Sequence, residues 1–146
     1  MQNTITITPA DPKCKEAIIA LLQSEKLPVE DLPVNLQNFF VAMDNGFVIG
    51  AIGLEVYDKD GLLRSLVVKS EYRKMKIAQG LIGEIEKFGT RLGLKNIYLL
   101  TETAQIYFIR KEYQVVERKE VPELLKQSSE FTYACPASAT LMKKSL

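Results

Sequence analysis

Apolar residues at the start of the chain follow first the period of a strand and then that of a helix. From Thr4 to Thr8, apolar and β-branched polar residues alternate, which predicts a strand. Asp11 and Pro12 next offer a helix N-cap and a proline at the first helical position. Ile18 and Leu21 then share one face of the predicted helix. The chain therefore opens with a strand and an amphipathic helix.

The next apolar segments have the length and the turn signals of strands. Pro28 and Pro33 interrupt the chain before them, so the stretch up to Gln37 is predicted as a short helix and a loop. Asp44-Asn45-Gly46 is a hairpin signal, and residues 58–61 make another turn. The strands are predicted at Phe39–Met43, Phe47–Val56 and Leu62–Val68. The third is almost continuously apolar, which predicts burial on both of its faces.

A long helix dominates the second half of the chain. Its apolar stripe predicts a helix from about Met75 to Leu92, with Gly93 ending it in the left-handed conformation. The later elements are predicted as a strand at Ile97–Leu100, a short helix at Thr103–Lys111, a strand from Val115, a helical segment at Pro122–Ser129 and a strand at Ser138–Met142. This mixed order differs from the regular alternation of a doubly wound parallel sheet.

Composition narrows the class of protein. The 146 residues fit a single domain over 1–146, and 47% apolar with 25% charged residues is an ordinary globular balance. With 19 basic and 18 acidic residues the net charge is +1, so no basic surface for nucleic acid is expected. No apolar run reaches the length of a membrane span, and the N-terminus lacks a signal peptide pattern. We therefore expect a cytoplasmic protein that does not engage a membrane.

The inventory of reactive side chains excludes several chemistries. The chain contains no histidine, which rules out Ser-His-Asp and Cys-His catalysts and histidine-based zinc chemistry. Cys14 and Cys135 form neither a CxxC pair nor a metal-ligand spacing, so no metal is expected. Cys14 is interpreted as a small core residue.

The segment from Leu62 to Ile82 is the most informative for chemistry. An apolar strand ends there, a short turn with Tyr72-Arg73 follows, and the long helix begins. Such a junction directs unpaired N–H groups and the positive end of the helix dipole at one point, which suits a pyrophosphate. Lys74 and Lys76 add positive charge. The alternative is that both lysines are only solvated surface charges.

This segment resembles the acetyl-coenzyme A motif of GNAT acetyltransferases, in which Arg or Gln is followed after two residues by Gly and, one residue later, by Gly or Ala. Arg73 and Ala78 match the first and last positions, whereas Lys76 occupies the glycine position. Residues 97–108 are similar to the following strand and helix, above all to those of N-acetylglutamate synthases. The sequence Cys-Pro-Ala-Ser-Ala at 135–139 resembles the ending of small GNAT proteins found with arsenic-resistance genes.

The resemblance implies an α+β GNAT fold: a mixed, mostly antiparallel twisted sheet of six or seven strands with helices on both faces. It also implies acetyl-CoA as the cosubstrate. Backbone N–H groups of Leu66, Val67 and Val68 are expected to receive the pantetheine arm and thioester. The residues expected around the pyrophosphate are Arg73, Lys74, Met75, Lys76, Ile77, Ala78 and Gln79. Lys76 is expected to fit the glycine position with a negative φ and an outward side chain.

The resemblance also provides candidate catalytic residues. The acceptor amine has to lose a proton, and Glu102, just past a strand, is the first candidate base, with Glu55 second. Many GNAT enzymes carry a tyrosine that protonates the leaving thiolate. Phe108 stands at that position and Tyr107 precedes it, which turns its side chain about 100° around the helix. The alternatives are a solvated surface charge for each carboxylate and a packing role for Tyr107.

Substrate contacts are expected from the cofactor strand. Arg64 and Ser65 lie on it, and Arg64 is able to hold a carboxylate through two parallel hydrogen bonds. The alternative for Arg64 is an ordinary surface ion pair. Glu112 replaces a frequent glycine before Tyr113, which predicts a different cap for that helix end.

Together these features predict an N-acetyltransferase that moves the acetyl group of acetyl-CoA to the amine of a small amino-acid-like molecule by direct attack. One alternative is a degenerate GNAT module that binds acyl-CoA weakly as a sensor, which Lys76 and Phe108 favour. Another is an interaction protein in which an open sheet edge or a helix face pairs two subunits as a homodimer.

Overall fold

The computed structural model describes residues 5–27, 29, 32, 36–128, 131 and 139–146. These residues form the strands β1 (Ile5–Pro9), β2 (Phe39–Asp44), β3 (Phe47–Tyr57), β4 (Asp60–Val68), β5 (Asn96–Thr101), β6 (Gln114–Val115) and β7 (Thr140–Ser145). The α-helices are α1 (Lys15–Ser24), α2 (Ile77–Arg91) and α3 (Gln105–Arg110). The 3-10 helices are η1 (Pro12–Cys14), η2 (Ser70–Met75), η3 (Arg118–Glu120) and η4 (Glu123–Gln127).

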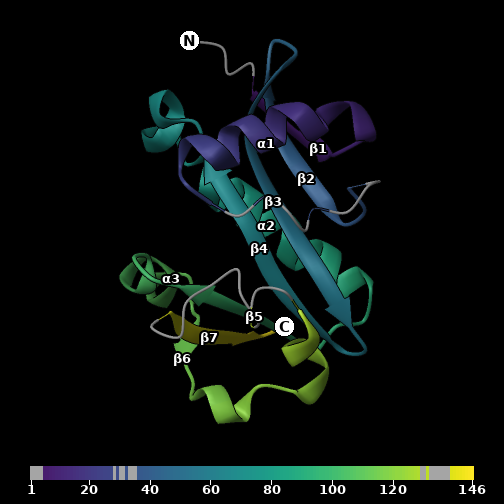
Figure 1. The fold of residues 1–146 in the computed structure, drawn as a ribbon, viewed down its shortest axis with the longest axis vertical. Helices are drawn as coiled ribbons and strands as arrows, with labels where there is room; N and C mark the ends of the chain where they lie inside the picture. The colour runs from purple at the N-terminus through teal and green to yellow at the C-terminus, as the bar shows by residue number, and fades with distance from the viewer. Residues whose placement is uncertain (1–4, 28, 30–31, 33–35, 129–130, 132–138) are drawn as a thin grey trace. The chain divides into compact units, whose positions relative to one another are not determined.

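The strands pair in one seven-stranded sheet with the order β1-β2-β3-β4-β5-β7-β6 (Figure 1). β4 and β5 pair in parallel, whereas β1–β2, β2–β3, β5–β7 and β6–β7 are antiparallel. The expected mixed, mostly antiparallel sheet is thereby confirmed, and so are the predicted strands, with bounds shifted by a few residues. The long helix begins at Ile77, two residues after its predicted start at about Met75, because the separate 3-10 helix η2 precedes it. Most of the stretch between Pro28 and Gln37 lies outside the described residues.

The chain divides into two compact units. Unit 1 comprises Met1–Leu54 and Ser65–Lys87, and unit 2 comprises Glu55–Arg64 and Phe88–Leu146. β3, β4 and α2 each contribute residues to both units. Along β4 the chain leaves unit 2 after Arg64.

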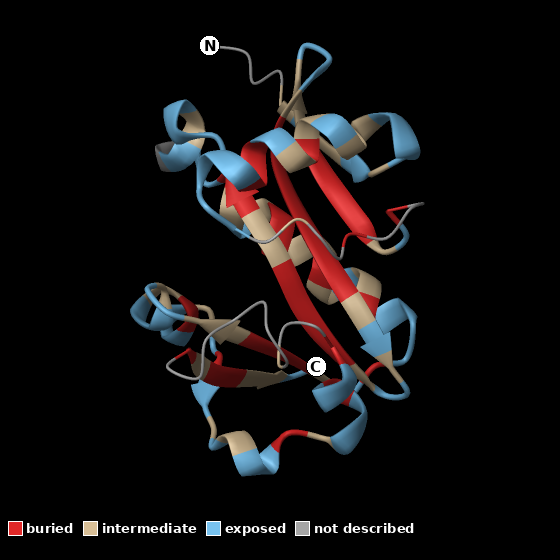
Figure 2. Cartoon of the chain, viewed as in Figure 1, coloured by how far each residue is buried: buried red, intermediate tan, exposed pale blue. Residues whose placement is uncertain are grey.

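Helices cover both faces of the strands in unit 1. In Figure 2, β2 and β3 are coloured largely as buried. Ile18 and Leu22 of α1 share one apolar core with Ala51 of β3. The preceding residue, Gly50, faces the other way because side chains alternate along a strand. A Cβ built on Gly50 would lie 3.3 Å from Leu81 Cδ1 of α2. α2 therefore packs on the face opposite to α1, as the predicted fold requires.

Unit 2 has an apolar core of its own. Parallel pairing joins residues 60–62 of β4 to residues 96–98 of β5, and β7 pairs with β5 along its whole length. The buried members of this core are Leu62, Tyr98, Val121, Leu125 and Leu141. Since two of them come from the segment that contains η3 and η4, that segment is part of the packed unit.

The two positions at which the resemblance places glycine both adopt a left-handed backbone. Lys76 has φ 60° and Glu112 has φ 73°. The expectation of a negative φ at Lys76 is therefore wrong: the chain keeps the backbone that glycine favours without the glycine. The different cap expected at Glu112 is also wrong, because Tyr113 N–H closes α3 on Phe108 O at 3.0 Å around the left-handed residue. Gly93, with φ 81°, ends the long helix as predicted.

Candidate active site

The predicted cofactor segment of unit 1 runs from the end of β4 to the first turn of α2. Leu66, Val67 and Val68 complete β4, and Val67 and Val68 are buried. η2 then carries the chain to Lys76, and α2 begins at the next residue. The expected strand, turn and helix are thus confirmed in this order. Of Lys74, which lies in η2, the side chain is outside what the structure describes.

Arg73 braces this segment from within unit 1. Its Nε donates to Val68 O at 3.2 Å, and its guanidinium forms an ion pair with Glu25. Nearly half of the side chain, 49%, is exposed. Arg73 thereby fixes η2 against the end of β4 while keeping part of its charge at the surface.

Lys76 differs from Arg73 in having no such partner. It is exposed, and among the described residues none forms a hydrogen bond or ion pair with its ammonium group. A left-handed backbone costs a non-glycine residue about 1–2 kcal/mol. Such strain is retained mainly where surrounding structure or function demands it. Lys76 therefore offers an unneutralised cation immediately before α2.

The start of α2 is held close to the strands of unit 1. Gly80 N–H donates to Lys76 O at 3.2 Å, and a Cβ on Gly80 would lie only 2.8 Å from Ile7 Cδ1. A side chain at this position would displace the terminal methyl of Ile7. The amides of the first helical turn, at Ile77 to Gln79, precede the regular hydrogen-bond pattern and point along the positive end of the helix dipole.

Tyr72 ties η2 to the β2–β3 hairpin. Its hydroxyl donates to Asp44 Oδ2 at 2.6 Å. This hydrogen bond to a carboxylate, together with a smaller effect of burial, raises the pKa of Tyr72. The cofactor segment is consequently anchored at Tyr72 and at Arg73 before it reaches Lys76.

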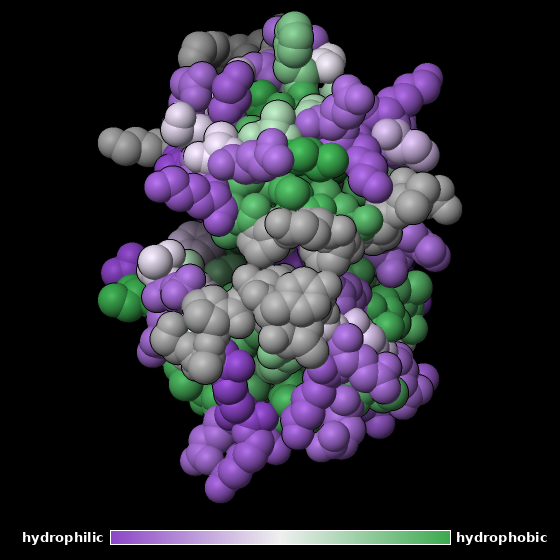
Figure 3. Space-filling view, viewed as in Figure 1, coloured by the Kyte–Doolittle hydropathy of each residue, from purple (hydrophilic) through white to green (hydrophobic). Residues whose placement is uncertain are grey.

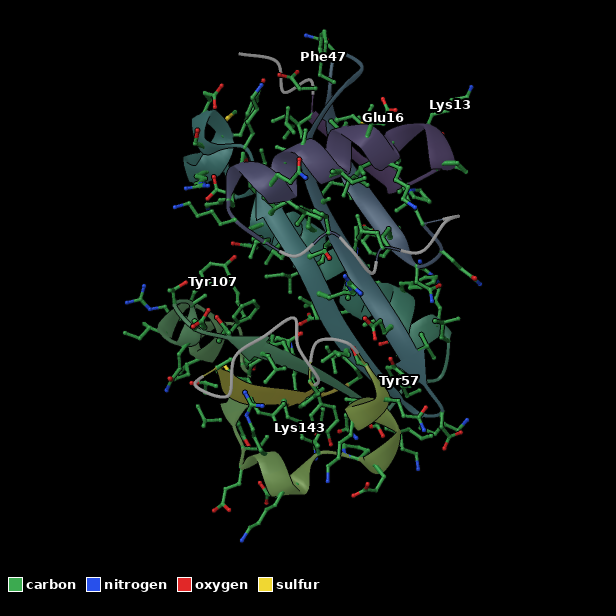
Figure 4. The ribbon with its side chains drawn as sticks, in the orientation of Figure 1. Lys13, Glu16, Phe47, Tyr57, Tyr107 and Lys143 are labelled. Carbon is green, nitrogen blue, oxygen red and sulfur yellow. The ribbon has the colours of Figure 1, made fainter. Side chains whose placement is uncertain are left out.

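A buried polar network lies in unit 2 and includes two residues predicted from the sequence. Arg64 Nη1 donates to Glu55 Oε2 at 2.7 Å, with 3% of the arginine side chain exposed. The other oxygen of Glu55 accepts a hydrogen bond from the hydroxyl of Tyr57, a residue labelled in Figure 4. The Tyr57 hydroxyl also bonds the side chain of Ser128. Burial, followed by the bond to Glu55, raises the pKa of Tyr57 to about 12. The surface ion pair considered for Arg64 is thus a buried one.

Glu102 is exposed just past β5 and has no described hydrogen bond to this network. Ser65, with φ 59°, forms a left-handed irregularity inside β4. Tyr57 and Ser128 are not among the site residues predicted from the sequence. Tyr57 could have been found from the hairpin, since it lies two residues from Glu55 on the same face of β3.

The two aromatic residues of α3 have different surroundings. Phe108 is buried, and its ring meets those of Tyr107 and Tyr113 edge to face, with 5.4 Å between centroids in each pair. Tyr107 is half-buried, with Lys111 Nζ 5.4 Å from its ring centroid, and burial raises its pKa. The side chain of Tyr107 is therefore the more accessible of the two, whereas the ring of Phe108 packs in the interior.

A cavity of about 400 Å³ occurs elsewhere in unit 2 and contains none of the predicted residues. It is lined by Arg118, Lys119, Val121, Lys126 and Phe131. Hydrophilic side chains cover the η3 part of unit 2 in the view of Figure 3. Lys119 and Lys126 form ion pairs with Glu117 and Glu123, so their charges are neutralised locally.

The protein has an α+β fold. Its candidate cofactor site consists of the end of β4, the 3-10 helix η2 and the first turn of α2. Residues 14–111 match the acetyltransferase (GNAT) family. The chain belongs to this family. It is also 30% identical over 99 residues to an uncharacterized N-acetyltransferase of Chlorobaculum tepidum, a match that spans 67% of this chain and 63% of that protein.

Solved structures share the fold at low sequence identity. The N-acetylglutamate synthase of Neisseria gonorrhoeae complexed with coenzyme A and N-acetyl-glutamate is 15% identical, with a TM-score of 0.83 over 100% of this chain and 36% of that one. A GNAT acetyltransferase of Staphylococcus aureus is 20% identical, with a TM-score of 0.78 over 97% and 99%. The PaiA N-acetyltransferase of Thermoplasma acidophilum in complex with coenzyme A is 20% identical, with a TM-score of 0.74 over 99% and 100%.

The helices of the described residues are too short or too polar to cross a membrane.

Proposed function

We propose that the protein is an acetyl-CoA-dependent N-acetyltransferase. The observation that carries the proposal is the junction of β4, η2 and α2, in which an uncompensated Lys76 with a glycine-like backbone precedes the helix start. An exposed cation and the first-turn amides of a helix together favour a pyrophosphate. The coenzyme A present in related structures supports the same assignment.

The proposed reaction is a direct transfer. The acceptor amine attacks the thioester carbonyl, the carbon–sulfur bond breaks, and coenzyme A leaves as the thiolate. Backbone N–H groups of Leu66, Val67 and Val68 are proposed to hold the pantetheine arm and thioester. Catalysis then comes mainly from aligning the reactants and polarising the carbonyl.

Two proton transfers accompany this reaction. The amine loses a proton to a carboxylate or to water, and Glu102, which is exposed past β5, is the first candidate. Glu55 is the weaker candidate because both of its oxygens already accept hydrogen bonds. The thiolate takes its proton from water or from Tyr107. A free thiol with a pKa of roughly 8.5 makes unassisted departure only modestly costly.

The proposed acceptor is a small amino-acid-like amine. Arg64 is the candidate for its carboxylate, since guanidinium groups bind carboxylates through paired hydrogen bonds. The N-acetyl-glutamate bound to the Neisseria synthase supports this class of acceptor. The chain spans only 36% of that synthase, so the synthase's own activity is not transferred to it.

The experiment is a screen of amines for release of free thiol from acetyl-CoA. The proposal predicts release above the amine-free rate for at least one amino acid, with stoichiometric acetylated product by mass spectrometry. Binding of acetyl-CoA without release for any amine would favour the alternative, a module that binds acyl-CoA without catalysis. The features behind that alternative are Phe108 at the usual acid position and Lys76 at the glycine position.

A further inference from the structure

Four polar side chains of unit 2 form a hydrogen-bonded series across three segments of the chain. Arg64 of β4 donates to Glu55 of β3, Tyr57 donates to the other oxygen of Glu55, and Ser128 bonds the Tyr57 hydroxyl. The two ends of the series are the most buried, with Arg64 at 4% and Ser128 at 2% exposure. Glu55 is thus held by a donor on each oxygen.

Stability alone gives little reason for a buried series of this kind. Removing two charges from water costs several kcal/mol for each ion, and well-packed apolar replacements of buried pairs are often neutral or stabilising. What the series does provide is a fixed guanidinium: Glu55 restrains Arg64, and Tyr57 with Ser128 restrains Glu55. A preorganised arginine binds a carboxylate without first losing side-chain freedom.

We propose that Tyr57 and Ser128 are positioning residues which, through Glu55, fix the Arg64 guanidinium for the carboxylate of an α-amino acid acceptor. This inference rests on the proposed function, because it assumes that an acceptor binds at Arg64. It assigns Glu55 to positioning in place of proton abstraction. A base has to present an oxygen to the amine proton, and both oxygens of Glu55 face protein donors.

The test compares Glu55→Gln, Tyr57→Phe and Ser128→Ala with the wild type. Acceptors are the best amino acid from the screen and its α-carboxamide, which keeps the amine but lacks the carboxylate. Each variant is expected to raise the KM of the amino acid about tenfold, in line with a weakened charge-assisted contact, and to leave kcat within about twofold. The kinetics of the carboxamide and the Kd of acetyl-CoA are expected to stay unchanged.

Tyr98→Phe is the matched control. Tyr98 is a buried member of the apolar core against which the partly buried Tyr57 packs, and it has no described hydrogen bond to Glu55. It loses the same hydroxyl and is expected to keep the wild-type KM. If Tyr57→Phe fails to fold, Glu55→Gln has nearly the same shape and carries the test.

Several outcomes overturn the inference. A wild type that uses acid and carboxamide with equal KM excludes a carboxylate contact while the proposed function stands. A fall in kcat for both acceptors in Glu55→Gln would show that Glu55 is the general base and not a positioning residue. An equal rise in the KM of the amino acid in Tyr57→Phe and Tyr98→Phe would mean that the hydrogen-bonded series contributes only to packing. A wild type that releases no thiol with any amine contradicts the proposed function itself.

Discussion

Arg64 and Arg73 stand nine residues apart on either side of the second half of β4, and each pairs with a glutamate of its own unit. Arg64, in unit 2, has 3% of its side chain exposed and contacts Glu55 at 2.7 Å, whereas Arg73, in unit 1, pairs with Glu25 and has 49% exposed. Burying a charge is costly unless it is paired with another protein group, whereas an exposed charge is largely solvated. Glu55 therefore restrains the Arg64 guanidinium inside unit 2, whereas Arg73 keeps about half of its side chain in contact with solvent.

The largest effect is expected from truncating each arginine to alanine. Arg64→Ala leaves Glu55 buried without its cation and is expected to lower the free energy of unfolding by about 3–5 kcal/mol. Arg73→Ala breaks a half-exposed pair and is expected to cost about 1 kcal/mol or less. Urea unfolding of both variants measures the difference. Equal losses would contradict the assignment of Arg64 to the interior.

Phe108 and Tyr107, which are neighbours in α3, also differ in burial: Phe108 is buried and Tyr107 is partly exposed. Phe108→Tyr adds a hydroxyl to a buried ring and is expected to cost about 1–3 kcal/mol of folding stability without lowering the turnover rate of the folded enzyme. Tyr107→Phe is expected to change both stability and rate little. If Tyr107→Phe instead removes most of the turnover while folding and cofactor binding survive, Tyr107 supplies the proton to the thiolate.

The exposed charges of Arg73 and Lys76 in unit 1 are expected to contribute to acetyl-CoA binding and to contribute little to folding stability. The double change Arg73→Ala and Lys76→Glu is expected to weaken acetyl-CoA binding about tenfold at low salt, since charge-assisted contacts are lost. The loss should shrink as salt rises, because exposed charges are screened. Titration calorimetry at two salt concentrations measures it, with Glu112→Lys as the unit 2 control. Unchanged affinity at low salt would mean that the phosphates bind elsewhere.

The smallest effect is expected at the two left-handed residues. Lys76→Gly and Glu112→Gly each relieve a strained backbone and are expected to stabilise folding by up to about 1 kcal/mol. Glu112 Oε2 lies 4.0 Å from Lys144 Nζ, and Glu112→Gly loses this ion pair. The gain in folding stability should therefore be smaller for Glu112→Gly than for Lys76→Gly. Acetyl-CoA affinity then tests the side chain: a drop in Lys76→Gly alone makes the lysine a phosphate ligand, and equal affinity means that lysine is merely tolerated.

Local patterns predicted the elements of this molecule but not its contacts. The periodicity of β1 and α2 and the hairpin signal before β3 located their elements within a few residues. The sign of φ at Lys76 could not be predicted, because packing of α2 at Gly80 and anchoring of Tyr72 hold that backbone in place.

The buried series shows the same limit at longer range. Glu55 and Arg64 are nine residues apart on paired strands, so hairpin register could have joined them. Ser128 comes from a segment that docks only through tertiary packing of Val121 and Leu125, and no local signal relates it to Tyr57. The tail at 135–138 and most of the loop after Leu27 lie outside the described residues, so those expectations stay predictions.

The phosphates of acetyl-CoA are proposed to bind at the start of α2. Chemical-shift mapping of backbone amides during titration with acetyl-CoA tests this proposal most directly, because the proposed ligands include N–H groups. Saturable shifts are expected that are largest at residues 76–79 and are accompanied by shifts at 66–68. Saturable binding that leaves the amides of 76–79 unmoved would contradict the proposal.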